Sequence, residues 1–159
     1  MATKIGNNAA NTIKGTSVLD KLLGKGGNDT ISGKAGNDKI DGGSGKDVIN
    51  GGAGDDWLIG GSGNDKLTGG TGSDVFSFKS GSGVDRITDF SVTEDKLAIK
   101  AGVNGIQTAN DVLDHATAGV DAHGNPTVSI NLGGGNKIIL QNVSLDDLIG
   151  DPAAHFVVI

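Results

Sequence analysis

A nine-residue repeat runs without a break through the first half of the chain. Reading from Gly6 in steps of nine gives eight contiguous units that end at Ser77. Gly stands at the first position of every unit, and Ile, Leu or Phe stands at the eighth. The sixth position is Asn in the first unit and Asp in the other seven. Self-similarity at a short fixed period is typical of a solenoid.

Each unit combines a turn with a short strand. The glycines allow positive φ, so the first six residues can turn tightly. The last three residues read x-apolar-x, which places one side chain inside the solenoid. Two units therefore make one coil of 18 residues, with a strand in each of two sheets. The sequence predicts an all-β parallel solenoid over residues 6–77, followed by a small β-rich capping region over residues 78–159.

The core of this solenoid is thin for the number of flexible residues that it must order. The chain has 29 Gly among its 159 residues, but only four Phe, one Trp and no Tyr. One column of apolar side chains in each sheet hardly offsets the conformational entropy lost by so many glycines. We therefore expect a bound ligand to stabilise the fold.

The repeated aspartates indicate that this ligand is calcium. Sixth-position Asp residues of every second unit would stack about 4.8 Å apart, and a cation between them would relieve their repulsion. An ion midway between two turns would lie about 2.4 Å from each, which suits Ca²⁺ and is too long for Mg²⁺. The chain has no Cys, and the repeats contain no His, so a soft-metal site is excluded there. Asp beside Gly is also ordinary turn chemistry, but a plain turn does not explain seven aspartates in register.

The units resemble the GGxGxDxUx nonapeptides of the RTX (repeats-in-toxin, hemolysin-type calcium-binding) proteins. The resemblance implies a calcium-bound parallel β-roll that leaves Gram-negative bacteria by type I secretion. It also implies that each ion lies between a turn and the turn two units later. The earlier turn would supply the carbonyls of its second and fourth residues and its Asp, and the later turn its first and third carbonyls and its Asp.

Carried over residue by residue, the resemblance predicts four calcium ions or more. The ligands of four successive sites would be Lys25, Gly27, Asp29, Gly42, Ser44 and Asp47; Lys34, Gly36, Asp38, Gly51, Ala53 and Asp56; Gly43, Gly45, Asp47, Gly60, Ser62 and Asp65; and Gly52, Gly54, Asp56, Gly69, Thr71 and Asp74. A second set of candidate ligands extends the array at both ends and comprises Asp20, Gly33, Ala35, Gly61, Gly63, Asp85, Asp89 and Asp95.

Some units depart from the family pattern. Ala9 and Val18 replace the fourth-position Gly, and Asn11 replaces the first Asp. We therefore expect the sites of the first two units to be weak or missing. Lys25 and Lys34 stand where the second Gly is expected, which puts the turn geometry there in question.

The second half of the chain has weaker local signals. Residues 84–99 resemble the segment that follows the roll in serralysin-type metalloproteases. Residues 120–143 predict an antiparallel pair of strands with a GGGN turn, and residues 110–118 predict a helix capped by Thr108. Ser144 begins a predicted capping box with an Asp three residues later.

The sequence also predicts where the second half packs on the repeats and how the chain is exported. The outward positions of the even-numbered units gather Trp57, Ile59 and Val75, and a patch with a Trp is seldom left bare. We expect strands around Phe90 and Leu97 to cover it. The terminal DPAAHFVVI resembles the C-terminal signal of type I secretion substrates, although a final core strand is a compatible alternative.

The chain lacks the motifs of the common secreted enzymes. It has neither HExxH nor GxSxG, so we expect no catalysis by this chain, which would instead be a non-catalytic module. The net charge of −6 and the absence of a basic stripe argue against a nucleic-acid partner. No apolar run is long enough for a transmembrane helix, and the first residues do not resemble an N-terminal signal peptide.

Our leading interpretation is a secreted, extracellular, monomeric module that folds on meeting calcium and has the type I secretion machinery as its partner. The first alternative is an accessory polysaccharide-binding module, fused to or accompanying a secreted enzyme such as an alginate epimerase. That function needs an exposed basic or aromatic groove, which the sequence does not reveal. The second alternative is a self-assembling structural module.

Overall fold

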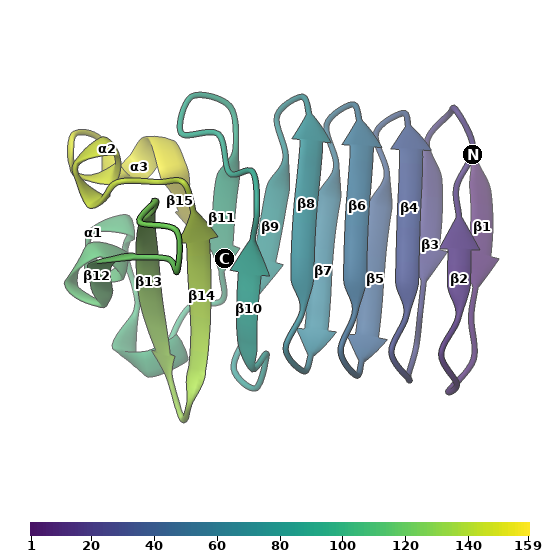
Figure 1. Ribbon diagram of the computed structural model, residues 1–159, viewed down its shortest axis with the longest axis horizontal. Helices are drawn as coiled ribbons and strands as arrows, with labels where there is room; N and C mark the ends of the chain where they lie inside the picture. Colours follow the sequence, from purple (N-terminus) through teal and green to yellow (C-terminus); the bar gives the residue numbers. More distant parts are fainter.

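The computed structural model describes residues 1–159 and has two mainly parallel sheets that face each other along a solenoid (Figure 1). One sheet has seven strands in the order β1-β3-β5-β7-β9-β11-β15, and the other has eight in the order β12-β13-β14-β10-β8-β6-β4-β2. The strands within the repeats and just before them are β1 (Ala2–Ile5), β2 (Thr12–Lys14), β3 (Asp20–Leu23), β4 (Thr30–Ala35), β5 (Lys39–Ser44), β6 (Val48–Ala53), β7 (Trp57–Ser62), β8 (Lys66–Thr71) and β9 (Val75–Phe78). The predicted all-β solenoid is confirmed.

The register places every eighth-position side chain in the core. Leu22 pairs with Ile40 and Ile40 with Leu58 along one sheet, each partner one coil of 18 residues further on. The fully buried side chains of the repeats are Leu22, Ile31, Ile40, Ile49, Leu58, Leu67 and Phe76. These columns form the thin core that the period predicts.

The coiling continues beyond the eighth unit. Strand β10 (Val84–Ile87) adds to β8 in parallel, with Ile87 paired to Leu67. Strand β11 (Lys96–Ile99) adds to β9, with Leu97 paired to Phe76. The spacing between equivalent residues increases from 18 to 20 and then 21 here. The strict nine-residue period therefore ends before the solenoid does.

The remaining residues close the C-terminal end of the roll, where the helices gather in Figure 1. The closing strands are β12 (Ala116–Val120), β13 (Pro126–Gly133), β14 (Asn136–Gln141) and β15 (Phe156–Val158). The short helices are η1 (Val103–Gly105), α1 (Ala109–Asp114), α2 (Leu145–Ile149) and α3 (Pro152–His155). Strand β14 pairs antiparallel with β13 but parallel with β10, so it also serves as a further rung of the roll.

Local signals in this region were mostly correct. Thr108 and Ser144 each form a capping box, with Asp111 and Asp147 respectively. The helix predicted over residues 110–118 is shorter than expected, because α1 ends at Asp114 and the next residues join β12. Pairing of β12 with β13 overrides the local helical signal.

The expectation that the Trp57 patch is covered is wrong. Phe90 and Leu97 instead prolong the core at the end of the roll: Leu97 is fully buried, and the Phe90 ring lies 6.2 Å from that of Phe76. Trp57 and Val75 remain half-buried on an open face.

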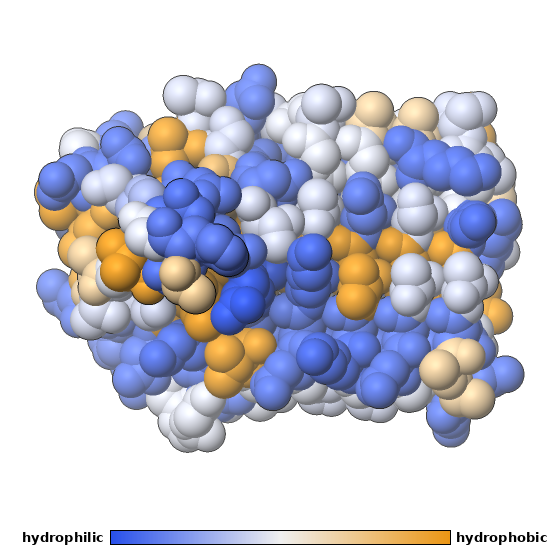
Figure 2. All heavy atoms as spheres, in the orientation of Figure 1, coloured by the Kyte–Doolittle hydropathy of each residue, from blue (hydrophilic) through white to orange (hydrophobic).

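The opposite outer face is more polar. Figure 2 shows that the exposed face of the eight-stranded sheet is mainly hydrophilic, with scattered hydrophobic side chains.

A helix of the length and apolar character needed to span a bilayer does not occur in the structure.

Candidate calcium sites

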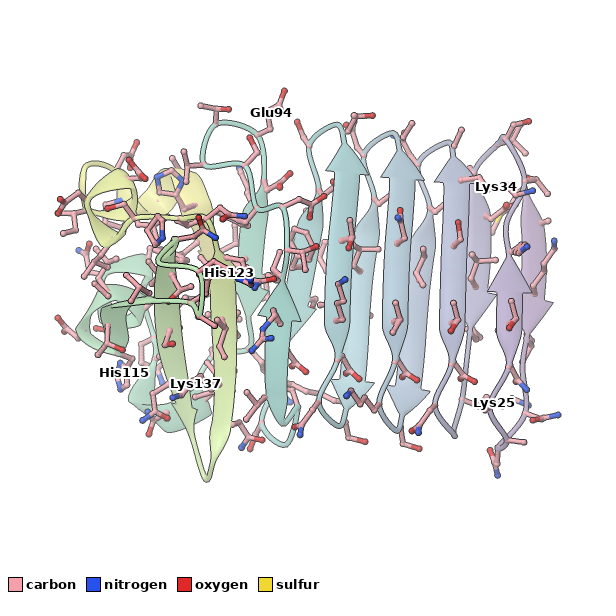
Figure 3. The ribbon with its side chains drawn as sticks, viewed as in Figure 1. Lys25, Lys34, Glu94, His115, His123 and Lys137 are labelled. Atoms are coloured by element: carbon pink, nitrogen blue, oxygen red, sulfur yellow. The ribbon has the colours of Figure 1, made fainter.

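The turns between strands lie in two rows along the edges of the roll (Figure 3). Positive φ occurs at the second and fourth residues of these turns, as at Gly43 (100°) and Gly45 (123°). Lys25 and Lys34 adopt the same sign of φ, 80° and 84°, despite their side chains. The turn is therefore retained where Lys replaces Gly, at a cost in backbone strain. Figure 3 shows these two lysines at opposite edges.

The first-position glycines serve a different purpose, which the sequence analysis missed. Their φ values are not positive. A Cβ on Gly42 would instead lie 2.3 Å from Oδ2 of Asp47 and 2.6 Å from the carbonyl oxygen of Gly60. Glycine is needed here because two oxygens occupy the space of a side chain.

The sixth-position aspartates form a ladder along each edge. Oδ1 of each Asp accepts a hydrogen bond from the backbone N–H of the residue 18 positions earlier, for example from Asp29 to Asp47 at 2.7 Å and from Asp38 to Asp56 at 2.7 Å. From Asp29 onwards, the second oxygen of each of these aspartates has no hydrogen-bond partner. The buried Oδ2 atoms without a hydrogen bond belong to Asp29, Asp38, Asp47, Asp56, Asp65, Asp74 and Asp85.

Each orphaned oxygen in the centre of the array faces a backbone carbonyl of the next coil. The Oδ2 atom and the carbonyl oxygen lie within 2.3–2.7 Å of one point, the Cβ position of a first-position glycine. The four pairs are Asp29 with Gly42, Asp38 with Gly51, Asp47 with Gly60, and Asp56 with Gly69. Two acceptors that converge without a donor are unfavourable, whereas a hard cation that takes oxygen ligands fits them.

The electrostatics point the same way. Burial raises the pKa of Asp56 to about 7 and those of Asp65 and Asp74 to about 6, and it also raises the pKa of Asp38 and Asp47. Neighbouring carboxylates add to the effect at each of these groups. Burial and mutual repulsion thus disfavour ionised aspartates in these turns, and a bound cation would remove that penalty.

The backbone would have to supply many of the ligands of such a cation. No group of three or more His, Asp or Glu side chains converges as a metal-binding cluster. The predicted sites use two aspartates each and complete their shell with carbonyl oxygens, which have a second lone pair even when one accepts a hydrogen bond.

The second set of candidate ligands is not uniform. Both oxygens of Asp20 are satisfied, by Ala2 and Thr16. Asp89 accepts from Gly69 and Gly70, and the two oxygens of Asp95 accept from Asp74 and Ser91.

Asp85 differs from these three residues. Its Oδ1 continues the ladder by accepting from Asp65 at 3.0 Å, its Oδ2 is orphaned, and burial raises its pKa to about 7. Of the aspartates in the second set, it is therefore the one that most closely matches those of the repeats.

A family model for the RTX calcium-binding nonapeptide repeat matches the chain in four overlapping copies, at residues 5–40, 23–58, 41–76 and 50–87. Together they cover more than half of the chain. The chain belongs to this RTX family. The fourth copy reaches residue 87, so the RTX match includes β10 and Asp85, in agreement with the continued coiling.

Solved structures share the fold at low sequence identity. The extracellular lipase LipA from Serratia marcescens is 18% identical with a TM-score of 0.52, over 99% of this chain and 40% of the lipase. The AlgE6R3 subunit of the Azotobacter vinelandii mannuronan C5-epimerase is 24% identical with a TM-score of 0.53, over 95% of this chain and 80% of that subunit. The RTX chain thus spans less than half the length of the lipase. No curated protein matches it by sequence.

Replacement of Gly51 by Ala tests the convergence of oxygens directly. The new Cβ would lie 2.3 Å from Oδ2 of Asp56 and 2.7 Å from the Gly69 carbonyl oxygen, so it must push them apart. We expect the calcium concentration at the midpoint of folding to rise about tenfold, as for the loss of one contact to a charged group. Circular dichroism, recorded as the free calcium concentration is raised, measures this midpoint.

Gly150 supplies the matched control. It has helical φ and ψ, and a Cβ there would meet nothing within 4 Å. Gly150→Ala should leave the midpoint unchanged. Equal midpoints for both variants would show that the space beside Gly51 is not a ligand site.

Proposed function

We propose that this RTX module remains unfolded at cytosolic calcium levels and folds when extracellular calcium binds its turns, and that it supports type I secretion in this way. The row of buried, orphaned aspartate oxygens carries the proposal. Extracellular calcium modules bind at about 10⁻⁴–10⁻³ M, so calcium would be bound outside the cell and not within it. Because calcium binds only the folded turns, it shifts the equilibrium towards the fold.

The ligand sets inferred from the RTX resemblance are our proposal for the four central sites, between residues 25 and 74. Each set contains one of the four convergent oxygen pairs. Asp85 would contribute to a further site at the end of the array. Asp20, Asp89 and Asp95, whose oxygens have partners, would instead hold the turns in place through their hydrogen bonds.

The thin core supports the same proposal. The repeats bury essentially one apolar side chain per nine residues, which is little area to offset the ordering entropy of a Gly-rich chain. Calcium binding would supply the missing free energy at the turns, where the glycines are concentrated.

The C-terminal residues are proposed to carry the export signal. In the folded chain, β15 (Phe156–Val158) pairs with β11 and Phe156 is buried. A signal placed there would be partly buried once the chain folds, which agrees with export of an unfolded chain.

Deletion of residues 146–159 should abolish export through a type I system, because it removes this segment. Calcium binding by the repeats should largely persist, and a calcium titration of the truncated chain checks it separately. Because deletion also removes a strand, residues 78–159 should in addition be fused behind a passenger protein. Export of the truncated chain, or failure of the fusion to be exported, would place the signal elsewhere.

A further inference from the structure

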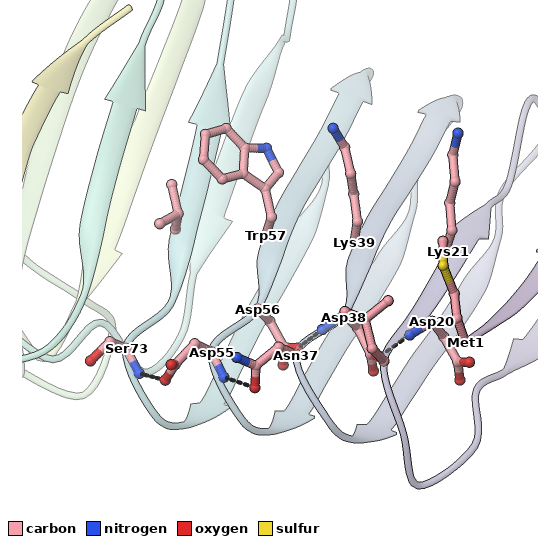
Figure 4. A pocket seen from close by; sticks show the side chains of 12 residues that line it. Met1, Asp20, Lys21, Asn37, Asp38, Lys39, Asp55, Asp56, Trp57 and Ser73 are labelled. Carbon is pink, nitrogen blue, oxygen red and sulfur yellow. Dashed lines mark hydrogen bonds between the residues drawn. The ribbon is translucent and has the colours of Figure 1, made fainter.

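The outer face of the seven-stranded sheet combines apolar side chains with charges of both signs. Figure 4 shows Lys21, Lys39 and Trp57 projecting in the same direction from successive strands of this face. The open groove beside them has a volume of about 410 Å³ and is lined by Val75 and by acidic residues of the turns as well. Such a mixed surface suits a partner that also carries both signs of charge and an apolar centre.

The outward side chains of this face form two rows along the roll axis. They are the residues on either side of each buried eighth-position side chain, namely the seventh and ninth residues of the even-numbered units. The register aligns Lys21, Lys39, Trp57 and Val75 in the first row and Leu23, Asp41 and Ile59 in the second, and Ser77 extends the second row on β9.

The two rows complement each other. Lys39 and Asp41 carry opposite charges on either side of a buried side chain of β5, whereas Trp57 and Ile59 are both apolar on β7. A twofold axis running along the roll between the rows would place the seventh residue of one copy on the ninth residue of another. Lys39 would then face Asp41, and Trp57 would face Ile59. Each contact would occur twice, because a twofold interface is isologous.

The outer face of the eight-stranded sheet lacks this complementarity. On β6, the same twofold operation would place Val48 on Asn50. On β8, it would place Lys66 on Thr68 and bury an ammonium group without an opposite charge, which is costly. The self-complementary pattern is therefore a property of the seven-stranded sheet alone.

The area of the face is sufficient for a specific but weak dimer. Its strands run nearly parallel to one another in Figure 1, so two copies of the sheet can stack along their length. Seven strands spaced at about 4.8 Å span about 30 Å, and the strands are about 10–20 Å long. Two copies would bury about 1,000 Å² in total, which is close to the lower limit for a specific interface.

We propose that this face is a homodimer interface, in which two folded copies stack their seven-stranded sheets about 10 Å apart around a twofold axis along the roll. Lys39 of each protomer pairs with the partner's Asp41, and Trp57 packs on the partner's Ile59 at the centre. The aliphatic stem of Lys21 covers the partner's Leu23 while its ammonium group stays in water. The dimer goes beyond calcium-dependent folding, whereas the sequence alone favoured a monomer.

Sedimentation equilibrium of the full chain in saturating calcium measures the association. An interface of this size predicts a dissociation constant that is micromolar or weaker, so the protein concentration should range from about 1 µM to about 1 mM. The wild-type chain should change from monomer to dimer over this range. Trp57 is the only Trp, so its emission should shift to the blue and become protected from quenchers as the protein concentration rises.

Charge reversal locates the interface and its axis. Lys39→Asp and Asp41→Lys should each weaken dimerisation about a hundredfold, because each change acts at two symmetric contacts worth about tenfold each. An equimolar mixture of the two variants should recover the wild-type affinity, because opposite charges then face each other again at both contacts. The matched control is Lys66→Asp, the same change at the equivalent position of β8, which should dimerise as the wild type does.

Three results would overturn the proposal: a wild-type chain that stays monomeric over the whole concentration range, equal dimerisation of Lys39→Asp, or a mixture of the two variants that does not associate. Each variant is first titrated with calcium by circular dichroism, so that a loss of the fold is detected separately. These three results would leave calcium-dependent folding intact. A wild-type chain that folds without calcium would instead refute the proposed function and not the interface.

Discussion

Chelation of calcium is expected to unfold the repeats. Without the ion, the buried Oδ2 atoms of Asp29, Asp38, Asp47, Asp56, Asp65 and Asp74 have no partner, and the ladder stacks negative charges along both edges. In small metal-dependent domains, the free energy of metal binding is the free energy of folding. The far-ultraviolet circular dichroism of the chelated chain should therefore lose its β signal.

The transition should reverse when calcium is restored and should be specific for it. Trp57 emission should shift to the blue as calcium is added, since the ring is half-buried in the fold. Magnesium at the same concentration should not refold the chain, because it prefers shorter distances and near-octahedral geometry. A chelated chain that keeps its β spectrum would show that calcium is not needed for the fold.

Substitution of a central aspartate should produce the largest effect of any single mutation in the roll. Asp47 serves two proposed sites, as the later Asp of one and the earlier Asp of the next. It also accepts from Asp29 at 2.7 Å and donates its own N–H to Asp65 at 2.8 Å. Asp47→Ala removes a ligand from both sites and leaves a buried N–H unsatisfied, so the calcium midpoint should rise by about tenfold or more.

Two other substitutions calibrate this result. Asp20→Ala lies at the end of the array, where Ala2 and Thr16 satisfy the carboxylate, and should shift the midpoint much less. Asp114→Ala is an exposed control on α1 and should not shift it. Circular dichroism against free calcium compares the three, and equal midpoints for Asp47→Ala and Asp20→Ala would refute the ranking.

The period alone predicted the solenoid, its core columns and the aspartate ladder. It did so because every repeat has the same surroundings. The places of Ile40 in the core and Asp47 in the turn therefore hold for the equivalent residues of the other repeats. The prediction failed where the spacing changes. The spacing before Asp85 and Asp95 is 20 and 21 residues instead of 18, so the nine-residue period does not predict the two further strands β10 and β11. A turn of different length preserves the strand pairing but breaks the period in the sequence.

Two features depend on contacts that the period does not encode. The first-position Gly51 resembles the other glycines in sequence, but its role follows from oxygens contributed by two different coils. The open face around Trp57 and Val75 depends on where residues 78–159 pack, which the period does not determine. Those residues prolong the roll instead of covering its face.

Crystals grown in calcium, with data collected for anomalous scattering, test the central claim most directly. Four or more anomalous peaks are expected in the turns between residues 24 and 74, each about 2.3–2.6 Å from its oxygen ligands. One peak should lie between Asp47 Oδ2 and the Gly60 carbonyl oxygen, and equivalent peaks should lie at the other three convergent pairs. Fewer than three peaks in these turns would contradict the assignment of the aspartate ladder as a calcium array.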